Sequence, residues 1–193
     1  MYGKTRAGIG LPPILDDEGI LLVKSGGGRL ADAAINGRLF SVANQAAVAV
    51  TANLTTTWTG LGVCNPSGSG KLLVIQEFGW SPSVVNPAEG VVGLMTATDT
   101  GFAAAIAARC ARNGYATSVA LCDDGATIST PVLERIVGST MEGAITTTTT
   151  AGPHIYRVDG SIILAPGRSV LTYHSIGGTA SLLFHFVWEE VDA

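Results

Sequence analysis

The sequence predicts an all-β protein, a jelly roll or β-sandwich with an extended N-terminal arm. Glycine, threonine, alanine and valine dominate the composition, while lysine occurs only at positions 4, 24 and 71. Charged residues make up 13% of the chain, about half the usual share. Short apolar runs alternate with turns rich in glycine and proline, which is typical of strands at sandwich spacing.

Residues 1–37 differ from the rest of the chain. They hold scattered apolar residues, the pair Pro12-Pro13, glycines at 26–28 and the dense acidic cluster at 16–18. Such a segment gains little by packing on itself. We therefore expect an arm over 1–37 and a jelly-roll domain over 38–193. A short strand near residues 20–23 would bind the arm to the sheet edge of a neighbouring subunit, or the chain's own domain would hold the arm. The expected partner-binding residues of the arm are Tyr2, Ile9, Leu11, Pro12, Pro13, Ile14, Leu21 and Leu22.

Strand patterns recur after residue 38. Residues 71–80 form the clearest central strand, and the dipeptide Asp159-Gly160 between two apolar runs, 155–158 and 161–164, predicts a hairpin. Pro166-Gly167 predicts the next turn. Further strands are expected over 38–50, 91–96, 117–121, 132–137, 141–145, 169–174 and 180–191.

The last strand has the most regular pattern. Alternation places one set of large apolar residues on a single face and a mixed set on the other. The mixed face is typical of a sheet surface that meets another surface or subunit. The predicted core residues of this strand are Leu182, Phe184, Phe186 and Trp188, and the opposite face carries Leu183, His185, Val187 and Glu189.

One stretch has two interpretations. Residues 102–113 are rich in alanine, and Phe102, Ile106 and Cys110 recur every four residues, which favours a short helix. The alternative is an extended excursion between strands.

The chain contains no specific catalytic motif. The three histidines are His154, His174 and His185; His174 and His185 could meet on adjacent strands, but no third metal ligand is suitably spaced. Gly68-Ser69-Gly70-Lys71 lacks the spacing of a phosphate-binding loop and reads as a turn. We expect no enzyme activity, no cofactor and no metal.

The remaining polar and aromatic residues have structural interpretations. Asp123-Asp124 precedes Gly125 and indicates a turn, and Glu189-Glu190 is interpreted as a solvated strand end. The cysteines at positions 64, 110 and 122 are expected to be small buried side chains, although a disulfide between the last two is allowed. The tryptophans at positions 58, 80 and 188 fit a core better than a sugar site.

Charge and hydropathy exclude some partners. A net charge of −4 disfavours nucleic-acid binding through phosphates. No apolar run approaches the length of a membrane span, and the start lacks the apolar core of a secretion signal. We expect a protein made and used in a reducing, soluble setting.

The C-terminal pattern resembles that of jelly-roll capsid decoration, or cement, proteins of tailed bacteriophages. The resemblance rests on residues 159–167, which end a strand in Pro-Gly, on the closing residues 186–190, and on 58–66 before a central strand. It covers residues 40–193 and implies a structural virion protein without catalytic residues. Such a homotrimer sits on the capsid surface and bridges major capsid protein subunits with its arms.

Three other functions compete with this one. A head-fibre or tail-tip module would bind host glycans through an exposed aromatic groove. A cupin-like metal enzyme would need His174 and His185 to converge. A shell component of the major-capsid type would need a long helix, which the sequence does not show.

Overall fold

A computed structural model describes residues 3–4, 10–11, 30–83, 89–98, 101–140, 153–178 and 182–193. The chain divides into two compact units, Met1–Asp32 and Ala33–Ala193. In the first unit, β1 (Gly3–Lys4) pairs antiparallel with β2 (Gly10–Leu11). The second unit, called the body below, contains all the other described strands.

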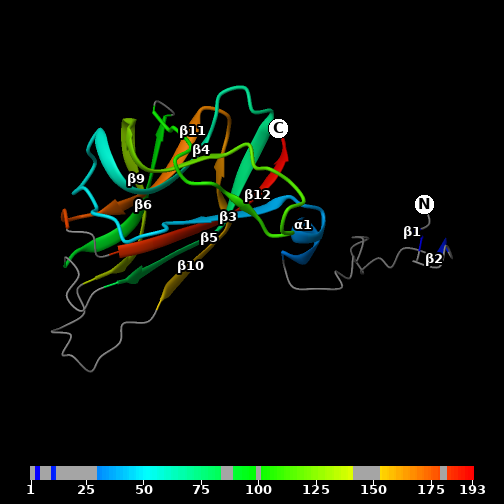
Figure 1. Cartoon of the computed structure of the whole chain (residues 1–193), viewed down its shortest axis with the longest axis horizontal. Coiled ribbons are helices and arrows are strands. Elements are labelled where there is room, and N and C mark those ends of the chain that lie inside the picture. Colours follow the sequence, from blue (N-terminus) through cyan, green and yellow to red (C-terminus); the bar gives the residue numbers. More distant parts are fainter. Residues whose placement is uncertain are drawn as a thin grey trace, which may run out of the picture. The chain divides into compact units, whose positions relative to one another are not determined.

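Two antiparallel five-stranded sheets form the body, as the sequence predicts (Figure 1). The first sheet has the order β10-β5-β12-β3-β7, and the second has the order β8-β4-β11-β6-β9. The strands of the first sheet are β10 (His154–Leu164), β5 (Lys71–Pro82), β12 (Leu182–Asp192), β3 (Leu39–Ala43) and β7 (Arg109–Cys110). Those of the second are β8 (Leu121–Thr127), β4 (Thr57–Asn65), β11 (Arg168–His174), β6 (Val91–Thr98) and β9 (Ser129–Ser139).

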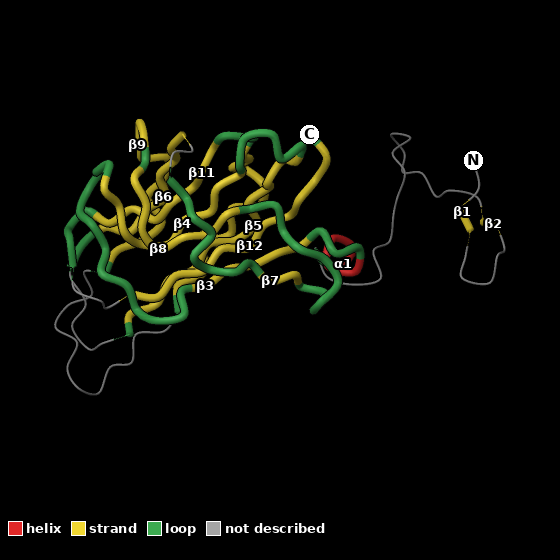
Figure 2. Tube along the Cα trace, turned by 45° about the horizontal axis from the view of Figure 1, so that its top comes forward, coloured by secondary structure: helices red, strands yellow, loops and turns green. Residues whose placement is uncertain are grey.

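The strand order is that of a jelly roll. Without β7 and β8, which lie at the sheet edges, the sheets read β10-β5-β12-β3 and β4-β11-β6-β9. The chain passes from one sheet to the other at most connections, so that the two layers are built together (Figure 2). Eight strands in two such sheets are the jelly-roll arrangement.

The main core fills the space between the sheets. The largest side chains come from β12 and β5, where Phe78 lies 5.0 Å from Phe186 and 6.1 Å from Phe184, measured between ring centroids. The second sheet contributes aliphatic residues of β4, β6 and β11. The four predicted core residues of the last strand, Leu182, Phe184, Phe186 and Trp188, are all at most 2% exposed.

A bulge in β5 keeps the core face continuous. Val187 of β12 pairs with Glu77, and Trp188 pairs with Ile75, so Gln76 is an extra residue of β5 between these two pairs. The extra residue changes the parity of β5. Leu73 and Ile75 therefore face the same core as Phe78 and Trp80.

The predicted hairpin at Asp159-Gly160 is wrong. Both halves belong to the single strand β10, and both pair with β5. Between Arg157, opposite Glu77, and Ile162, opposite Ile75, four residues of β10 face the single residue Gln76. Asp159 and Gly160 have φ of 51° and 75°. This is the conformation of a tight hairpin turn, but here it accommodates the extra residues of an edge strand that continues in the same direction.

Residues 101–110 are extended, and the short helix of the body lies elsewhere. Phe102 stacks on Trp58 at 6.3 Å, and Ile106 donates its N–H to the Cys122 carbonyl at 3.0 Å. These contacts with the second sheet outweigh the helix propensity of the alanines. The helix α1 (Ala31–Ile35) falls in the region predicted as arm; Gly37, with φ of 70°, ends it.

The other strand predictions vary in outcome. The described strands β5, β6, β9 and β11 fall within or overlap the predicted ranges, and β8 begins at Leu121, where a predicted strand ends. Residues 141–145 lie outside the described residues. Within the described part of the chain, no helix is long and apolar enough to cross a membrane.

A buried amide at the start of the 65–71 turn joins three strands. Asn65 is 0% exposed, and its Nδ2 donates to the carbonyl oxygens of Lys71 at 2.7 Å and Leu164 at 2.8 Å. Its Oδ1 accepts from the Ser69 hydroxyl at 2.6 Å. The turn that connects β4 to β5 is thereby tied to the end of β10.

Asn65→Ala should lower the free energy of unfolding by about 2 kcal/mol, because two buried carbonyls lose their donor. Urea unfolding followed by tryptophan fluorescence measures the change. Ser67→Ala, at an exposed position of the same turn, is the control and should shift stability by less than about 0.5 kcal/mol. Equal stability of the two variants would show that the amide does not hold the turn.

Candidate functional site

The described strands leave the outer face of the first sheet uncovered. Its side chains alternate with the core residues, and they are partly or fully exposed. The outer face of the second sheet differs, because Trp58, Met95 and Leu171 there are buried beneath Phe102 and Ile128. The residues of the uncovered face are Ser41, Ala43, Leu72, Val74, Glu77, Ile155, Arg157, Ile163, Leu183, His185, Val187, Glu189 and Val191.

This outer face is aliphatic with paired charges. His185 Nε2 lies 3.1 Å from Glu77 Oε1, and Arg157 stands opposite Glu77 on β10. A Cβ on Gly79 would lie 2.0 Å from the His185 ring, so only glycine lets the ring lie flat against β5. The His185 ring is thereby fixed toward Glu77.

Ion pairs mark the end of the face near the C-terminus. Arg38 contacts Glu189 at 2.9 Å, and Lys71 Nζ contacts Asp192 Oδ1 at 2.6 Å. The hydrogen bond from Lys71 and its charge hold the pKa of the Asp192 carboxyl below its usual value. These pairs are partly exposed to solvent and add little to stability.

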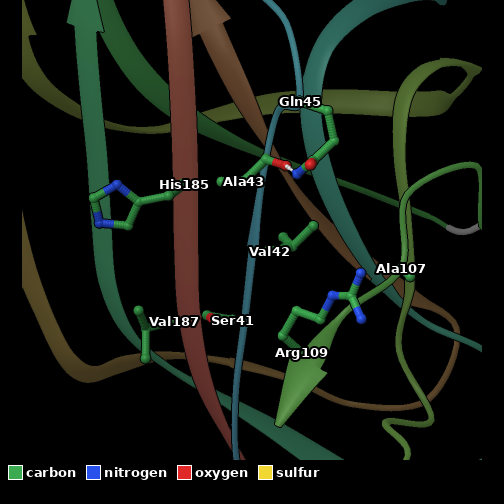
Figure 3. A pocket seen from close by; sticks show the side chains of 8 residues that line it. All are labelled: Ser41, Val42, Ala43, Gln45, Ala107, Arg109, His185 and Val187. Carbon is green, nitrogen blue, oxygen red and sulfur yellow. Dashed lines mark hydrogen bonds between the residues drawn. The ribbon is translucent and has the colours of Figure 1, made fainter. Parts of the chain in front are cut away.

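A hollow of about 360 Å³ opens where β7 leaves the edge of β3 (Figure 3). The ladder between β3 and β7 covers only Phe40 with Cys110 and Ser41 with Arg109. Beyond it, the Ala43 carbonyl accepts a hydrogen bond from Gln45 Nε2 at 3.0 Å. The lining residues are Ser41, Val42, Ala43, Gln45, Ala107, Arg109, His185 and Val187.

The lining of the hollow holds one exposed cation beside small and aliphatic side chains. Arg109 is exposed and has no ion pair with a described residue, and the lining contains no carboxylate. A nucleophile needs a base within about 3 Å. His185 lies over Gly79, toward β5 and away from Ser41 (Figure 3), so no such pair forms here.

The three histidines are not brought together. His174 is on β11 in the second sheet, 2% exposed, and its Nε2 lies 3.3 Å from the Thr140 hydroxyl. His185 is on the first sheet, and His154 stacks on Trp80 at 4.0 Å. The described residues contain no group of three His, Cys, Asp or Glu side chains placed to hold a metal ion.

Two acidic predictions are wrong. Asp123-Asp124 lies within β8 rather than in a turn: Asp123 is buried, and its carboxylate accepts from the N–H of Ala103 at 2.9 Å and of Asp124 at 2.9 Å. Glu190 is 6% exposed rather than solvated. It accepts from the Ser118 hydroxyl and from the Val119 N–H at 3.0 Å. Both carboxylates fix loop backbone to a sheet.

The aromatic and cysteine predictions have clearer outcomes. All three tryptophans are at most 3% exposed, so they belong to the core, and Tyr115 is exposed beside the Arg112 guanidinium at 3.8 Å. Cys64, Cys110 and Cys122 are free thiols. Cys110 is partly exposed, so only Cys64 and Cys122 are fully buried.

The predicted arm residues cannot be placed. Leu11 is in β2, and the side chains of the eight arm residues lie outside the described ones. Sequence reasoning missed Glu77, Arg109 and Arg157 as surface residues of one sheet. The signal was available for Glu77 and Arg157, because each occupies an alternate position of a predicted strand; Arg109 lies in the stretch with two interpretations.

Comparisons of this chain with models of protein families, with curated protein sequences and with solved structures found no match.

Cys122 should be nearly inert toward alkylation in the native protein. Burial, and then the charges of Glu190 and Asp123, raise the pKa of its thiol from 9.0 to about 12. At pH 9 about one thiol in a thousand would be ionised, and only the thiolate reacts. Iodoacetamide labelling read by peptide mass spectrometry should modify Cys110 first, and Cys122 only on unfolding.

The same pKa shift sets a pH dependence of stability. The folded state binds this proton more tightly than the unfolded state, so its contribution is complete below pH 9 and declines as the pH rises toward 12. Rapid native labelling of Cys122 at pH 9 would contradict both expectations.

Proposed function

We propose that this protein is a structural virion protein that decorates and cements the exterior of a tailed-phage capsid. In this proposal a homotrimeric body sits on the shell, and N-terminal arms reach over neighbouring major capsid protein subunits. The protein would be made in the host cytoplasm and act on the capsid surface without enzymatic activity.

The division of the chain at Asp32 is the observation that carries the proposal. Every strand of the two sheets lies between Leu39 and Asp192, and the first 32 residues form a separate unit. A cement protein needs a body that folds on its own and a segment free to bind elsewhere. An ordered arm can cover a wide contact surface, which offsets the entropy lost on binding.

The composition of the surface adds support. Charged residues are 13% of the chain, whereas a protein that stays monomeric usually carries more surface charge. The outer face of the first sheet is mostly aliphatic, and its charges are largely paired. Such a face loses little solvation energy when a partner covers it.

The alternatives lack comparable support. A glycan-binding module needs exposed aromatic rings beside carboxylates, but the three tryptophans are buried. A cupin-like enzyme needs histidines that converge inside the sandwich, whereas His185 lies on the outer face of the first sheet beside Glu77 and His174 is buried in the second sheet. A shell component of the major-capsid type needs a long helix, whereas the described helix α1 is only five residues long.

Deleting residues 1–29 should weaken binding to capsids of the same virus and leave the body folded. We expect an unchanged β-sheet circular dichroism spectrum and at least a tenfold weaker affinity, equivalent to about 1.4 kcal/mol. Co-sedimentation of the protein with capsids that lack it measures the affinity.

Point variants separate arm contacts from the mere presence of an arm. Leu21→Ser with Leu22→Ser should weaken binding, and Ser25→Ala in the same segment is the control. If the full chain does not bind these capsids, or if the shortened chain binds as tightly, the decoration proposal is wrong.

A further inference from the structure

The edge strand β7 covers only part of the edge of β3. The ladder between them ends where Ser41 pairs with Arg109, and the same register would place Ala107 opposite Ala43. That pair does not form, because the preceding chain belongs to the other sheet, where Ile106 pairs with β8. The hollow of about 360 Å³ occupies the resulting gap beside β3 (Figure 3).

The backbone groups of Ala43 point into this gap. Asn44 donates its N–H to the Phe184 carbonyl of β12, and consecutive residues of a strand direct their backbone groups to opposite sides. The N–H and C=O of Ala43 are therefore directed away from β12. In the described part of the chain the N–H has no ladder partner, and the C=O accepts the side-chain amide of Gln45 at 3.0 Å. An open pairing position of this kind accepts a further extended segment.

A cation lies beside the same gap. Arg109 lines the hollow, is exposed and has no ion pair with a described residue. Residues 101–122, which include this part of the rim, contain no acidic residue and a second arginine, Arg112. A carboxylate brought into the hollow would gain an ion pair without displacing another acid. The open edge and the cation together select an extended peptide that carries acidic side chains.

One stretch of the sequence combines these two properties. Asp16, Asp17 and Glu18 are the only run of three acidic residues in the sequence, and residues 20–23 are all aliphatic, with a β-branched residue at each end. Only Gly19 separates the acidic run from the aliphatic one. A bound strand at residues 20–23 would thus bring its carboxylates to within a few residues of the pairing position.

We propose that residues 16–23 of one copy bind in the hollow of another copy, with residues 20–23 added to the edge of β3 at Ala43 and the acidic run beside Arg109. Strand addition supplies the backbone hydrogen bonds, and the ion pair sets the orientation of the segment. The donor segment and the acceptor edge are different surfaces, so a closed ring of three copies uses all of them. The inference deepens the proposed function, since it rests on a self-assembling homotrimer with arms and names where an arm is held.

A charge exchange tests the contact in the full chain. Arg109→Glu should weaken self-association about fivefold, because a carboxylate would then face the acidic run. Asp16→Arg with Asp17→Arg should weaken it to a similar extent, and the combination of all three substitutions should restore it. Sedimentation equilibrium measures the mass, with three chains of 19.7 kDa expected for the wild type. Arg168→Glu, at an exposed arginine of the second sheet, is the control and should leave the mass unchanged.

A bulky side chain in the hollow provides a second test with a matched control. Ala107→Trp should reduce self-association about tenfold, because a filled hollow excludes the incoming segment. Ala105 is exposed two residues earlier and does not line the hollow, so Ala105→Trp should have no such effect. Circular dichroism confirms that each variant is folded.

Three results would overturn the inference. The first is a monomeric wild type, and the second is an unchanged mass of Arg109→Glu at every concentration at which the wild type dissociates. The third is a combined charge variant that associates no better than its parents. An arm that binds the hollow of its own copy gives the second result, so the same measurement separates binding within a copy from binding between copies.

Capsid binding distinguishes this inference from the proposed function. A wild type that associates through the hollow but fails to bind capsids would refute the decoration role and leave the contact standing. An Arg109→Glu variant that stays assembled, together with a wild type that binds capsids, would refute the contact and leave the decoration role standing.

Discussion

The pairing of β12 with β5 is the constraint on which the rest of the body depends. The two strands pair from Leu182 opposite Pro82 to Asp192 opposite Lys71. Their register places the four large residues of β12 beside Phe78 and Trp80, and it also decides which residues reach the outer face. A shift by one residue would exchange the two faces. Burying His185 and Glu189 while exposing Phe186 and Trp188 would cost far more than the body's net stability allows.

The bulge at Gln76 extends this constraint to both neighbours of β5. On one side of β5, the bulge lets β12 pair along the whole strand although the core residues of β5 change from odd positions to even positions at Gln76. Leu73 and Ile75 precede the bulge, Phe78 and Trp80 follow it, and both pairs face the core. On the other side, four residues of β10, at positions 158–161, sit opposite the same Gln76. The irregularity is thus shared by three strands. It is also what brings Arg157 midway between Ile155 and Ile163, so a feature that serves the core arranges the surface.

Patterns of alternation predicted the fold class and the apolar face of β12, because burial of every second residue is a local signal. Features that depend on distant partners were not predictable in the same way. Asp159-Gly160 has the conformation of a hairpin turn, but whether the chain reverses there depends on the strand that both flanks pair with. Residues 101–110 have helical propensity, yet the uncovered face around Trp58 draws Phe102 into an extended path. The burial of Glu190 depends on backbone N–H groups of a loop about 70 residues away in sequence. For the arm, the sequence lists candidate contacts whose partners lie outside the chain itself.

The two sheets present their outer faces to different surroundings, and this asymmetry limits how copies of the body can associate. The second sheet covers its own outer face with Phe102 and Ile128, whereas the side chains on the outer face of the first sheet are partly or fully exposed in the described part of the chain. The edge strands β9 and β10 are also protected against pairing with a further strand. Pro131 of β9 has no N–H to donate, and the residues of β10 opposite Gln76 interrupt its backbone ladder. Open-ended addition of strands is therefore disfavoured at both edges.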